Sequence, residues 1–487
     1  MIDKIQGFKN ACVECLDNFS LGQLRNYGRA IGVDVPTKKK KGELITEIVG
    51  VLAGEIPPIE RSKRGAPVKD EYVDPSLEQA IAKQRYVWLA GIEPPVRLTY
   101  FESKMMNPNV LMVQSDDNSM TYEQYQAQPI YCGQLQMIDD VPTLVDMQGD
   151  LEGERLIVSI ELIRQYGLRD GDIITCHAHE KMGVWAAKNI LTINSIVAGT
   201  ETRFIFDEES VVYPSQRIRF PENVEQSPAA KYINYVLPLG YGQRCLVSSA
   251  PKAGKSVFLR DVAKTLSGYT RGQTLFVLLI DQSPELISSY QSFMSPENLV
   301  ATSYDDEPER HIFAAEFLLK RAKRFAENGK NVVLIIDSLT KLAKSYNETR
   351  DSEGGKTMPC GLEFKTLHYL KKYFGSARAF SEEGSLTLIG TASFGTGDAM
   401  DDVIYSEASS LANAEIRLSD SLAKARLFPA VDVSASYTDA LETLLNDKEK
   451  AAEEAFRKKE ATPNGEAVRE LLLKSANFDE FYRRVMK

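Results

Sequence analysis

The fold of this chain is decided by residues 246–266, LVSSAPKAGKSVFLRDVAKTL. A short apolar run enters a loop of small residues that carries Gly254, Lys255 and Ser256, and apolar residues then recur at helical spacing. Strand, loop and helix in this order predict a phosphate-binding loop. Small residues let backbone N–H groups and the start of the helix face a di- or triphosphate. We expect Lys255 to reach the β- and γ-phosphates of a bound nucleotide and Ser256 to hold Mg²⁺.

The loop departs from the usual pattern at its start. Ser249 stands where the first glycine is expected, and Pro251 and Lys252 lie inside the loop. The alternative interpretation is an ordinary strand-to-helix turn. Because a strand precedes the loop and a helix follows it, nucleotide binding is favoured. The predicted nucleotide-binding residues of the loop are Pro251, Lys252, Ala253, Gly254, Lys255 and Ser256.

The length of 487 residues predicts more than one domain, and the composition predicts a soluble protein. Hydrophobic residues make up 43% and charged residues 26%, and no apolar run approaches the ~20 residues that span a bilayer. The N-terminal sequence MIDKIQGFKN lacks the apolar core of a signal peptide, and the six cysteines form no disulfide framework. A reducing cytoplasm is therefore expected. The net charge of −10 argues against a uniformly basic coat, so any nucleic-acid site must be local.

The N-terminal part predicts a helical module followed by a linker. Residues 1–55 contain apolar residues at helical spacing on both sides of four consecutive lysines, Lys38 to Lys41. This basic run is either a solvated loop or a corner that contacts phosphates. Residues 56–127 are interrupted by prolines and turn residues, and they predict a linker with one short helix near residues 76–89.

The remaining sequence predicts a barrel, an α/β core and C-terminal helices. Residues 128–200 alternate like short strands and suggest a small OB-like β-barrel. Residues 201–445 alternate near-continuous apolar strands with helices, which is typical of a parallel sheet covered on both faces. Residues 446–487 predict two helices. Ligands of such sheets lie at the carboxyl ends of the strands.

This arrangement of strands predicts a role for one aspartate. Asp337 closes the strand VVLIID, so we expect it to hold Mg²⁺ through the metal's water molecules. The alternative is a surface aspartate at the end of a strand.

Several segments together resemble the bacterial transcription termination factor Rho family. They include the connector YPSQRIRF, the lead-in PLGYGQR, the loop APKAGKS, the segment YDDEPERH, the strand IIDSLTKLAKSYN, and then YFGSAR and LFPAVD. The resemblance covers nearly the whole chain. It implies a RecA-like α/β ATPase core related to the catalytic subunits of F-type ATP synthases. It also implies a homohexameric ring that binds RNA on the OB domains and in a central channel, and that uses ATP and Mg²⁺ to move along RNA and dislodge RNA polymerase.

The resemblance also assigns roles to residues outside the phosphate loop. Phe428 matches the aromatic residue that packs on adenine, and Arg426 matches a catalytic arginine near the subunit boundary. Lys356, in SEGGKTMPCG, matches a lysine of a central loop expected to touch RNA. Asp337 matches the carboxylate on the magnesium side, in agreement with its place at the end of a strand.

The departures from the family fall on residues that drive hydrolysis. In LLIDQSPE, Gln282 replaces the acidic residue that activates the attacking water, and Asp439 replaces an arginine that reaches the neighbouring subunit's site. Glutamine can position water but cannot accept its proton, and general-base help is worth ~100- to 10,000-fold. An arginine finger contributes ~1,000- to 100,000-fold. Both changes predict slow hydrolysis, unless Glu285 stands in as the base.

Several residues that contact RNA in the family are also replaced in this chain. In the barrel, Pro142 and Leu144 occupy the positions of two stacking phenylalanines, and Asp146 replaces a basic residue. Ala399 replaces a lysine of the second channel loop, and Asp420 replaces an arginine. Because stacking contributes ~1 to 3 kcal/mol per base, the RNA site of the barrel is expected to be weak or altered.

Four functions remain open at this point. The first is a Rho-type ATPase that translocates on RNA, and the second is a regulatory paralogue that binds ATP and RNA without turnover. The third is a proton- or secretion-linked ATPase subunit, which would need no OB barrel. The fourth is a DNA-binding architectural protein that uses the lysines at residues 38–41. A preference for RNA over duplex DNA would favour the first two over the fourth.

Overall fold

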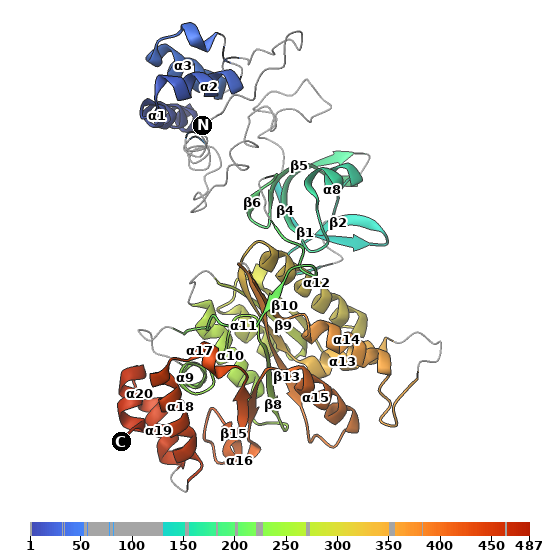
Figure 1. Cartoon of the computed structure of the whole chain (residues 1–487). Helices are drawn as coiled ribbons and strands as arrows, with labels where there is room; N and C mark the ends of the chain where they lie inside the picture. The colour runs from blue at the N-terminus through green and yellow to red at the C-terminus, as the bar shows by residue number, and fades with distance from the viewer. Residues whose placement is uncertain are drawn as a thin grey trace. The chain divides into compact units, whose positions relative to one another are not determined.

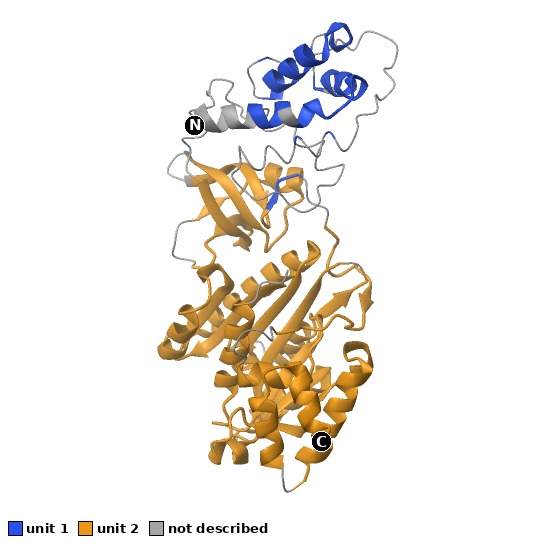
Figure 2. Cartoon of the chain, turned by 90° about the vertical axis from the view of Figure 1, so that its left-hand side faces the viewer, with its two compact units in different colours: residues 1–128, 196–201 blue, residues 129–195, 202–487 orange. Residues whose placement is uncertain are grey.

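A computed structural model gives the structure of the protein (Figure 1). It describes residues 2–31, 33, 35–52, 56, 77, 81, 130–150, 155–181, 184–199, 203–220, 227–268, 273–349, 356–381, 383–462 and 465–487. The chain divides into two compact units, which are residues 1–128 with 196–201 and residues 129–195 with 202–487 (Figure 2). Nearly all of the predicted linker, with its short helix, lies outside the described residues. No helix in the described ranges is long and apolar enough to cross a membrane.

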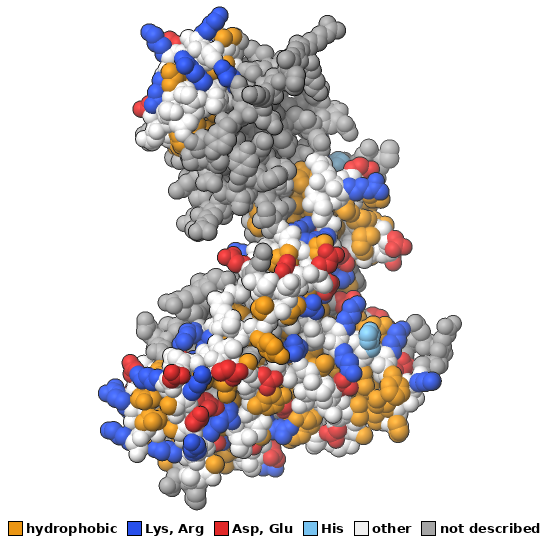
Figure 3. Space-filling view, viewed as in Figure 1, with side chains coloured by type: hydrophobic (Ala, Val, Ile, Leu, Met, Phe, Trp, Pro, Cys, Tyr) orange, Lys and Arg blue, Asp and Glu red, His pale blue; other side chains and the backbone are white. Residues whose placement is uncertain are grey.

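The first unit contains a small helical module. Its elements are α1 (Ile2–Asp17), α2 (Leu21–Ala30), the 3₁₀ turn η1 (Pro36–Lys38) and α3 (Lys41–Leu52). The module has its own buried apolar core, which includes Leu16, Leu24 and Leu44. Lys and Arg side chains are visible on its surface (Figure 3). Two of the four consecutive lysines pair with carboxylates, because Lys39 contacts Glu47 and Lys41 lies 3.4 Å from Asp17.

The second unit begins with a five-stranded barrel. Strand order is β3-β2-β1-β4-β5, and a parallel pairing of β3 with β5 closes the sheet. A tight turn with positive φ at Asp139 and Asp140 joins β1 to β2. The predicted OB-like barrel is therefore present. Its elements are β1 (Ile130–Ile138), β2 (Val141–Val145), β3 (Leu156–Ile157), α8 (Ile160–Tyr166), β4 (Ile173–Lys181) and β5 (Val184–Ile193); the short strand β6 (Ile196–Val197) comes next in the sequence.

The core of this unit is a mostly parallel sheet with the order β10-β9-β11-β13-β8-β14-β15. Its apolar strands are buried on both faces, as the sequence predicts. Only β15 runs antiparallel along this path; off it, β12 pairs with β13, and β7 pairs with β12. The strands are β7 (Val211–Val212), β8 (Arg244–Ser249), β9 (Gln273–Gln282), β10 (Leu299–Ser303), β11 (Asn331–Asp337), β12 (Arg378–Phe380), β13 (Ser385–Ser393), β14 (Ala414–Leu418) and β15 (Val431–Thr438).

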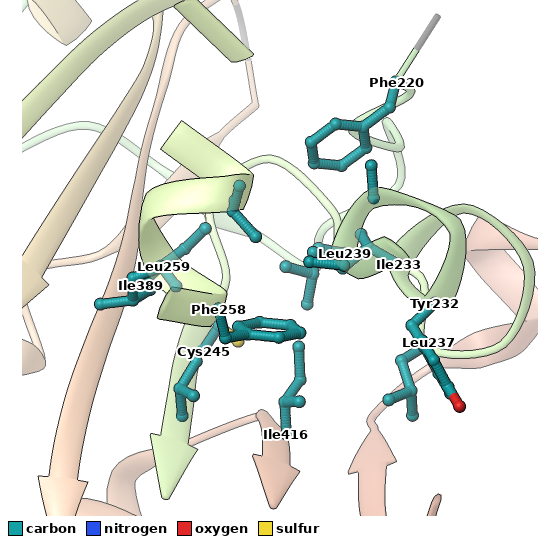
Figure 4. Close-up of a cluster of buried hydrophobic side chains, with 14 of the residues drawn as sticks. Phe220, Tyr232, Ile233, Leu237, Leu239, Cys245, Phe258, Leu259, Ile389 and Ile416 are labelled. Carbon is teal, nitrogen blue, oxygen red and sulfur yellow. The ribbon is translucent and has the colours of Figure 1, made fainter. Parts of the chain in front are cut away.

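Helices cover both faces of the sheet (Figure 1). One face packs against α9 (Pro228–Tyr235) and α10 (Lys255–Ser267), and Phe258 of α10 lies among apolar side chains from α9, β8 and β14 (Figure 4). The other face packs against α12 (Pro308–Glu327), α13 (Leu339–Glu348), α14 (Phe364–Phe374) and α15 (Ala399–Leu411). The remaining helices among the described residues of this unit are α11 (Pro284–Gln291), η3 (Pro296–Asn298), α16 (Asp420–Lys424), α17 (Leu441–Leu444), α18 (Asp447–Glu460), α19 (Gly465–Lys474) and α20 (Phe478–Val485). The prediction of two helices over residues 446–487 is wrong, because a break after Glu460 and another at residues 475–477 divide this segment into three.

The barrel and the core share buried polar contacts. Arg321 of α12 donates through Nε to the side-chain oxygen of Gln134 in β1 at 2.7 Å. Gln134 in turn donates through Nε2 to the carbonyl oxygen of Phe317 at 2.7 Å. Gly171, which has φ +95°, lets the barrel approach α12 closely, because an added Cβ would lie 2.7 Å from the backbone of Lys320. The barrel is therefore fixed to α12 by specific contacts.

Candidate nucleotide site

The phosphate loop joins the end of β8 to the start of α10. Lys252 has φ +64° and Gly254 has φ +94°, so the loop turns sharply before the helix begins at Lys255. No side chain caps the start of α10. Unpaired N–H groups at a helix start carry a partial positive charge and form a ready site for a phosphate. The predicted strand, loop and helix are therefore in place, with Pro251 and Lys252 exposed and Ala253 buried.

Lys255 points its ammonium group back across this loop. Its Nζ donates to the carbonyl oxygen of Ser249 at 3.2 Å and to the Ser249 hydroxyl at 2.9 Å. Burial lowers the pKa of Lys255, and the nearby charges of Asp337 and Asp401 act in the opposite direction. A partly desolvated cation at this place is suited to a phosphate, because the low dielectric strengthens their attraction.

Asp337 ends β11 and has the surroundings expected of a magnesium-side carboxylate. It is 4% exposed, and its Oδ1 accepts a hydrogen bond from the Thr391 hydroxyl at 2.9 Å. Its Oδ2 is buried and has no hydrogen-bond partner among the described residues. Buried polar atoms are nearly always paired, so this oxygen suits a water of a hydrated cation. Together with the hydroxyl of Ser256 at the start of α10, these residues fit Mg²⁺ bound beside a phosphate.

Gln282 ends β9, next to Asp337. Its side chain is 7% exposed, and its Nε2 donates to the carbonyl oxygen of Asp337 at 2.9 Å. The amide N–H group is thus used within the protein, and the amide oxygen is left as the acceptor that can orient a water molecule. Glu285 lies in the first turn of α11 on the surface, where backbone and Ser283 hydrogen bonds lower its pKa. A carboxylate of lowered pKa is a weaker base, which argues against Glu285 as a substitute.

An aromatic ring lies over the phosphate loop. Phe428 is 51% exposed, and a Cβ added to Gly254 would lie 3.4 Å from its ring. A large exposed ring beside a phosphate loop offers a stacking surface for the base of a nucleotide. Arg426, two residues earlier, is exposed and has φ +61°. Loop, lysine, carboxylate, amide and ring therefore meet at one end of the sheet.

Asp439 lies at the other end of the sheet within this chain. It follows β15, whose last residue Thr438 pairs with Ala414, and Ala414 pairs with Cys245 near the start of β8. The phosphate loop begins after Ser249, about five residues or ~16 Å further along β8. Asp439 is thus remote from the phosphate loop of its own chain. Its predicted role concerned a neighbouring subunit.

The second loop predicted to contact RNA lies before α15, and its charged residues are acidic. Asp398 and Asp401 form ion pairs with Lys344 at 2.8 and 2.7 Å. The uncharged residue Ala399 is the first of α15. The first loop contributes Lys356, which is exposed, and residues 351–355 before it lie outside the described residues. The lysine is therefore available to a polyanion, whereas the second loop offers little attraction.

The three barrel residues that occupy the family's RNA-contacting positions, Pro142, Leu144 and Asp146, are not placed to stack on a base. Leu144 is fully buried, Pro142 is half-buried, and Asp146 accepts hydrogen bonds from the backbone N–H groups of Gln148 and Asp150. No role for Trp185 of β5 was predicted from the sequence, and this residue is 41% exposed. The available signal was a lone tryptophan in the strand VWAAKNILTI.

The fold is that of the P-loop nucleotide-binding proteins of the RecA-like α/β class, with an OB-like barrel before the nucleotide-binding core. Consistent with this class, residues 229–438 match the family model of the ATP synthase alpha/beta family, nucleotide-binding domain. A solved structure described as a prototypical ATPase from the type III secretion system of pathogenic bacteria aligns over 62% of this chain and 94% of its own, with a TM-score of 0.48 and 18% identity.

Curated relatives narrow the class to one family. Transcription termination factor Rho of Borreliella burgdorferi is 37% identical over 304 residues, which are 61% of this chain and 58% of the relative. Rho of Mycobacterium tuberculosis is 33% identical over 375 residues, 74% of this chain and 62% of the relative. Rho of Salmonella typhimurium is 33% identical over 300 residues, 60% of this chain and 71% of the relative. The chain belongs to the transcription termination factor Rho family, although it matches only about 60% of the length of the first two relatives.

Proposed function

We propose that the chain is a Rho-type protein that binds ATP and RNA and acts in transcription termination, with slow ATP hydrolysis. The observation that carries this proposal is the meeting of Lys255, Asp337, Gln282 and Phe428 around one phosphate loop. Family membership supports the RNA and transcription part. A homohexameric ring, a cytoplasmic location and contact with RNA polymerase belong to the same proposal.

The proposed ATP site assigns one task to each residue. Lys255 exchanges its contacts with Ser249 for the β- and γ-phosphates, and the start of α10 donates N–H groups to the same phosphates. Ser256 and Asp337 would hold Mg²⁺ and its water, and a cation held there would supply positive charge beside the phosphates. Phe428 stacks on the base. Arg426, nearby on the surface, contacts a subunit boundary in the proposed ring.

The step that limits hydrolysis is activation of water. The oxygen of the Gln282 side chain can accept a hydrogen bond from the attacking water, but an amide cannot take its proton. Absence of a general base costs ~100- to 10,000-fold in rate. Since Glu285 is exposed with a lowered pKa, a nucleotide-gated regulator that binds ATP and RNA without turnover is the second candidate function.

RNA binding in this proposal uses fewer groups than a fully basic site. Trp185 offers an exposed ring on the barrel, and Lys356 offers a charge at the predicted channel loop. Stacking on one aromatic residue contributes ~1 to 3 kcal/mol per base. The acidic residues around Lys344 do not add attraction for phosphates. We therefore expect weak, salt-sensitive RNA binding.

The function is tested with the purified full-length chain. Direct ATP titration and steady-state phosphate release are measured with and without poly(C) and mixed-sequence RNA. ATP binding with slow, RNA-stimulated release supports the proposal. ATP binding without any release favours the regulator, and no ATP binding overturns both. Competition between RNA and duplex DNA provides a further check, because preference for duplex would favour the architectural protein.

A further inference from the structure

The strand that carries Gln282 contains an irregularity immediately before it. In the parallel ladder of β9 and β10, Leu279 pairs with Ala301, and the next pair is Gln282 with Ser303. Two residues of β9 therefore face the single residue Thr302. Asp281, the second of the two, has φ +50°, which is uncommon for a residue other than glycine. Bulges of this kind bend a strand and redirect the side chains that follow.

The hydroxyl of Thr302 replaces the missing ladder contacts at the bulge. Its Oγ1 accepts a hydrogen bond from the backbone N–H of Asp281 at 3.1 Å and lies 3.4 Å from the carbonyl oxygen of Leu279. His311, in the first turn of α12, places Nδ1 2.8 Å from the same hydroxyl. Thr302 is 1% exposed and His311 is 6% exposed. The contact is therefore sheltered from water, which would otherwise compete with it.

Lys341 contacts the next peptide group, at the carbonyl of Asp281. Its Nζ donates to the carbonyl oxygen of Asp281 and lies 3.4 Å from Oδ2 of that residue. Both polar groups of the Asp281 backbone are thus occupied, the N–H by Thr302 and the carbonyl by Lys341. The adjacent Gln282 then reaches the carbonyl of Asp337 at 2.9 Å. Fixing one residue in an unusual conformation fixes the direction of the next side chain.

We propose that the Thr302 hydroxyl, held in place by His311, is a positioning group that keeps the bulge closed and aims Gln282 at the attacking water. Neither residue touches the nucleotide in this role, and both act through the backbone of Asp281. The inference rests on the proposed function, because Gln282 can orient water only if the site binds ATP. It adds a link between α12, whose other end holds the barrel through Arg321, and the water-orienting residue.

Thr302→Val tests the proposal, because valine keeps the shape of threonine and removes only the hydroxyl. Thr302→Ser is the matched control that keeps the hydroxyl. We expect Thr302→Val to lower kcat by about 10- to 100-fold, because a small misplacement of a water-orienting group has effects of this size. The ATP dissociation constant, measured by direct titration, should stay within about twofold, and Thr302→Ser should retain the wild-type kcat. His311→Leu should behave as Thr302→Val does.

A second measurement does not depend on turnover. Hydrogen exchange of the Asp281 amide in the full-length chain should accelerate in Thr302→Val and not in Thr302→Ser. Affinity for ADP with aluminium fluoride, which mimics the transferring phosphoryl group, should fall relative to affinity for ADP alone. If wild-type protein binds ATP without turnover, the ATPase function fails and these two measurements still decide the positioning role. An unchanged Asp281 exchange rate and an unchanged affinity ratio in Thr302→Val would overturn it.

Discussion

Replacing Lys255 by methionine should remove most of the affinity for ATP. Methionine keeps the length and the apolar stem of lysine and loses only the charge and its hydrogen bonds. The ammonium group is partly buried beside the loop, and the energy of its attraction to a phosphate depends on that environment. At 4 Å and an effective dielectric constant of 20, two unit charges attract by about 4 kcal/mol. A charged hydrogen bond contributes about 1.5 to 3 kcal/mol net.

Part of this attraction is already offset, because Lys255 must first leave its contacts with Ser249. We therefore expect a net loss of about 2 to 4 kcal/mol, which corresponds to a dissociation constant raised about 30- to 700-fold. The matched control is Lys264→Met on the same helix, because Lys264 is exposed in the last turn of α10. Its affinity for ATP should stay within about twofold of the wild-type value.

The assay is equilibrium titration of the full-length protein with ATP and Mg²⁺ at fixed ionic strength. Thermal unfolding without nucleotide checks that each variant is folded. If folded Lys255→Met binds ATP within about threefold of the wild type, Lys255 does not contact phosphate and the assignment of the loop is wrong.

Three further predictions concern chemistry, pH and RNA. Gln282→Glu should raise RNA-stimulated phosphate release at least about tenfold, because it supplies a base. The same change should lower the unfolding free energy by about 1 to 3 kcal/mol, because a carboxylate cannot donate to the Asp337 carbonyl. Unchanged release would mean that the missing acid is not the limiting defect. ATP affinity should be full below the pKa of Lys255 and decline as pH rises through it; because this pKa is lowered, the decline should begin at a lower pH than the titration of an ordinary lysine. Lys255→Met should show no such decline between about pH 7 and pH 10. Trp185→Ala should weaken binding of single-stranded RNA by about 5- to 150-fold while Trp185→Phe retains most of it; equal affinities of the two variants would remove Trp185 from the RNA site.

The sequence is sufficient for the parts of this site that depend on local pattern. Buried strands, the small-residue loop and the helix after it are each encoded within about ten residues, and Asp337 follows from its place at the end of a strand. The fold class is confirmed for the same reason. Each of these features needs only the neighbours of a residue along the chain.

Features that depend on register and strand direction could not be read from the sequence. The contact between Gln282 and the Asp337 carbonyl joins residues from different strands, and the bulge opposite Thr302 appears only when β9 and β10 are aligned. The place of Asp439 depends on β15 running antiparallel to β14. Likewise, alternation along β2 could not tell which face of the barrel is buried, and so could not show that Leu144 points inward.

The uncapped start of α10 makes the stability of the core depend on the supply of nucleotide. Its first N–H groups donate to no capping side chain, and with Gly254 at the N-cap the protein gives up about a few tenths of a kcal/mol relative to a Ser, Thr, Asp or Asn cap. A phosphate bound there restores those bonds only in the folded chain. At 100 times the dissociation constant, the gain is about 2.7 kcal/mol of unfolding free energy. A fall in the ATP level around the protein would therefore lower its melting temperature as well as its occupancy, and would shorten its lifetime wherever unfolded chains are degraded.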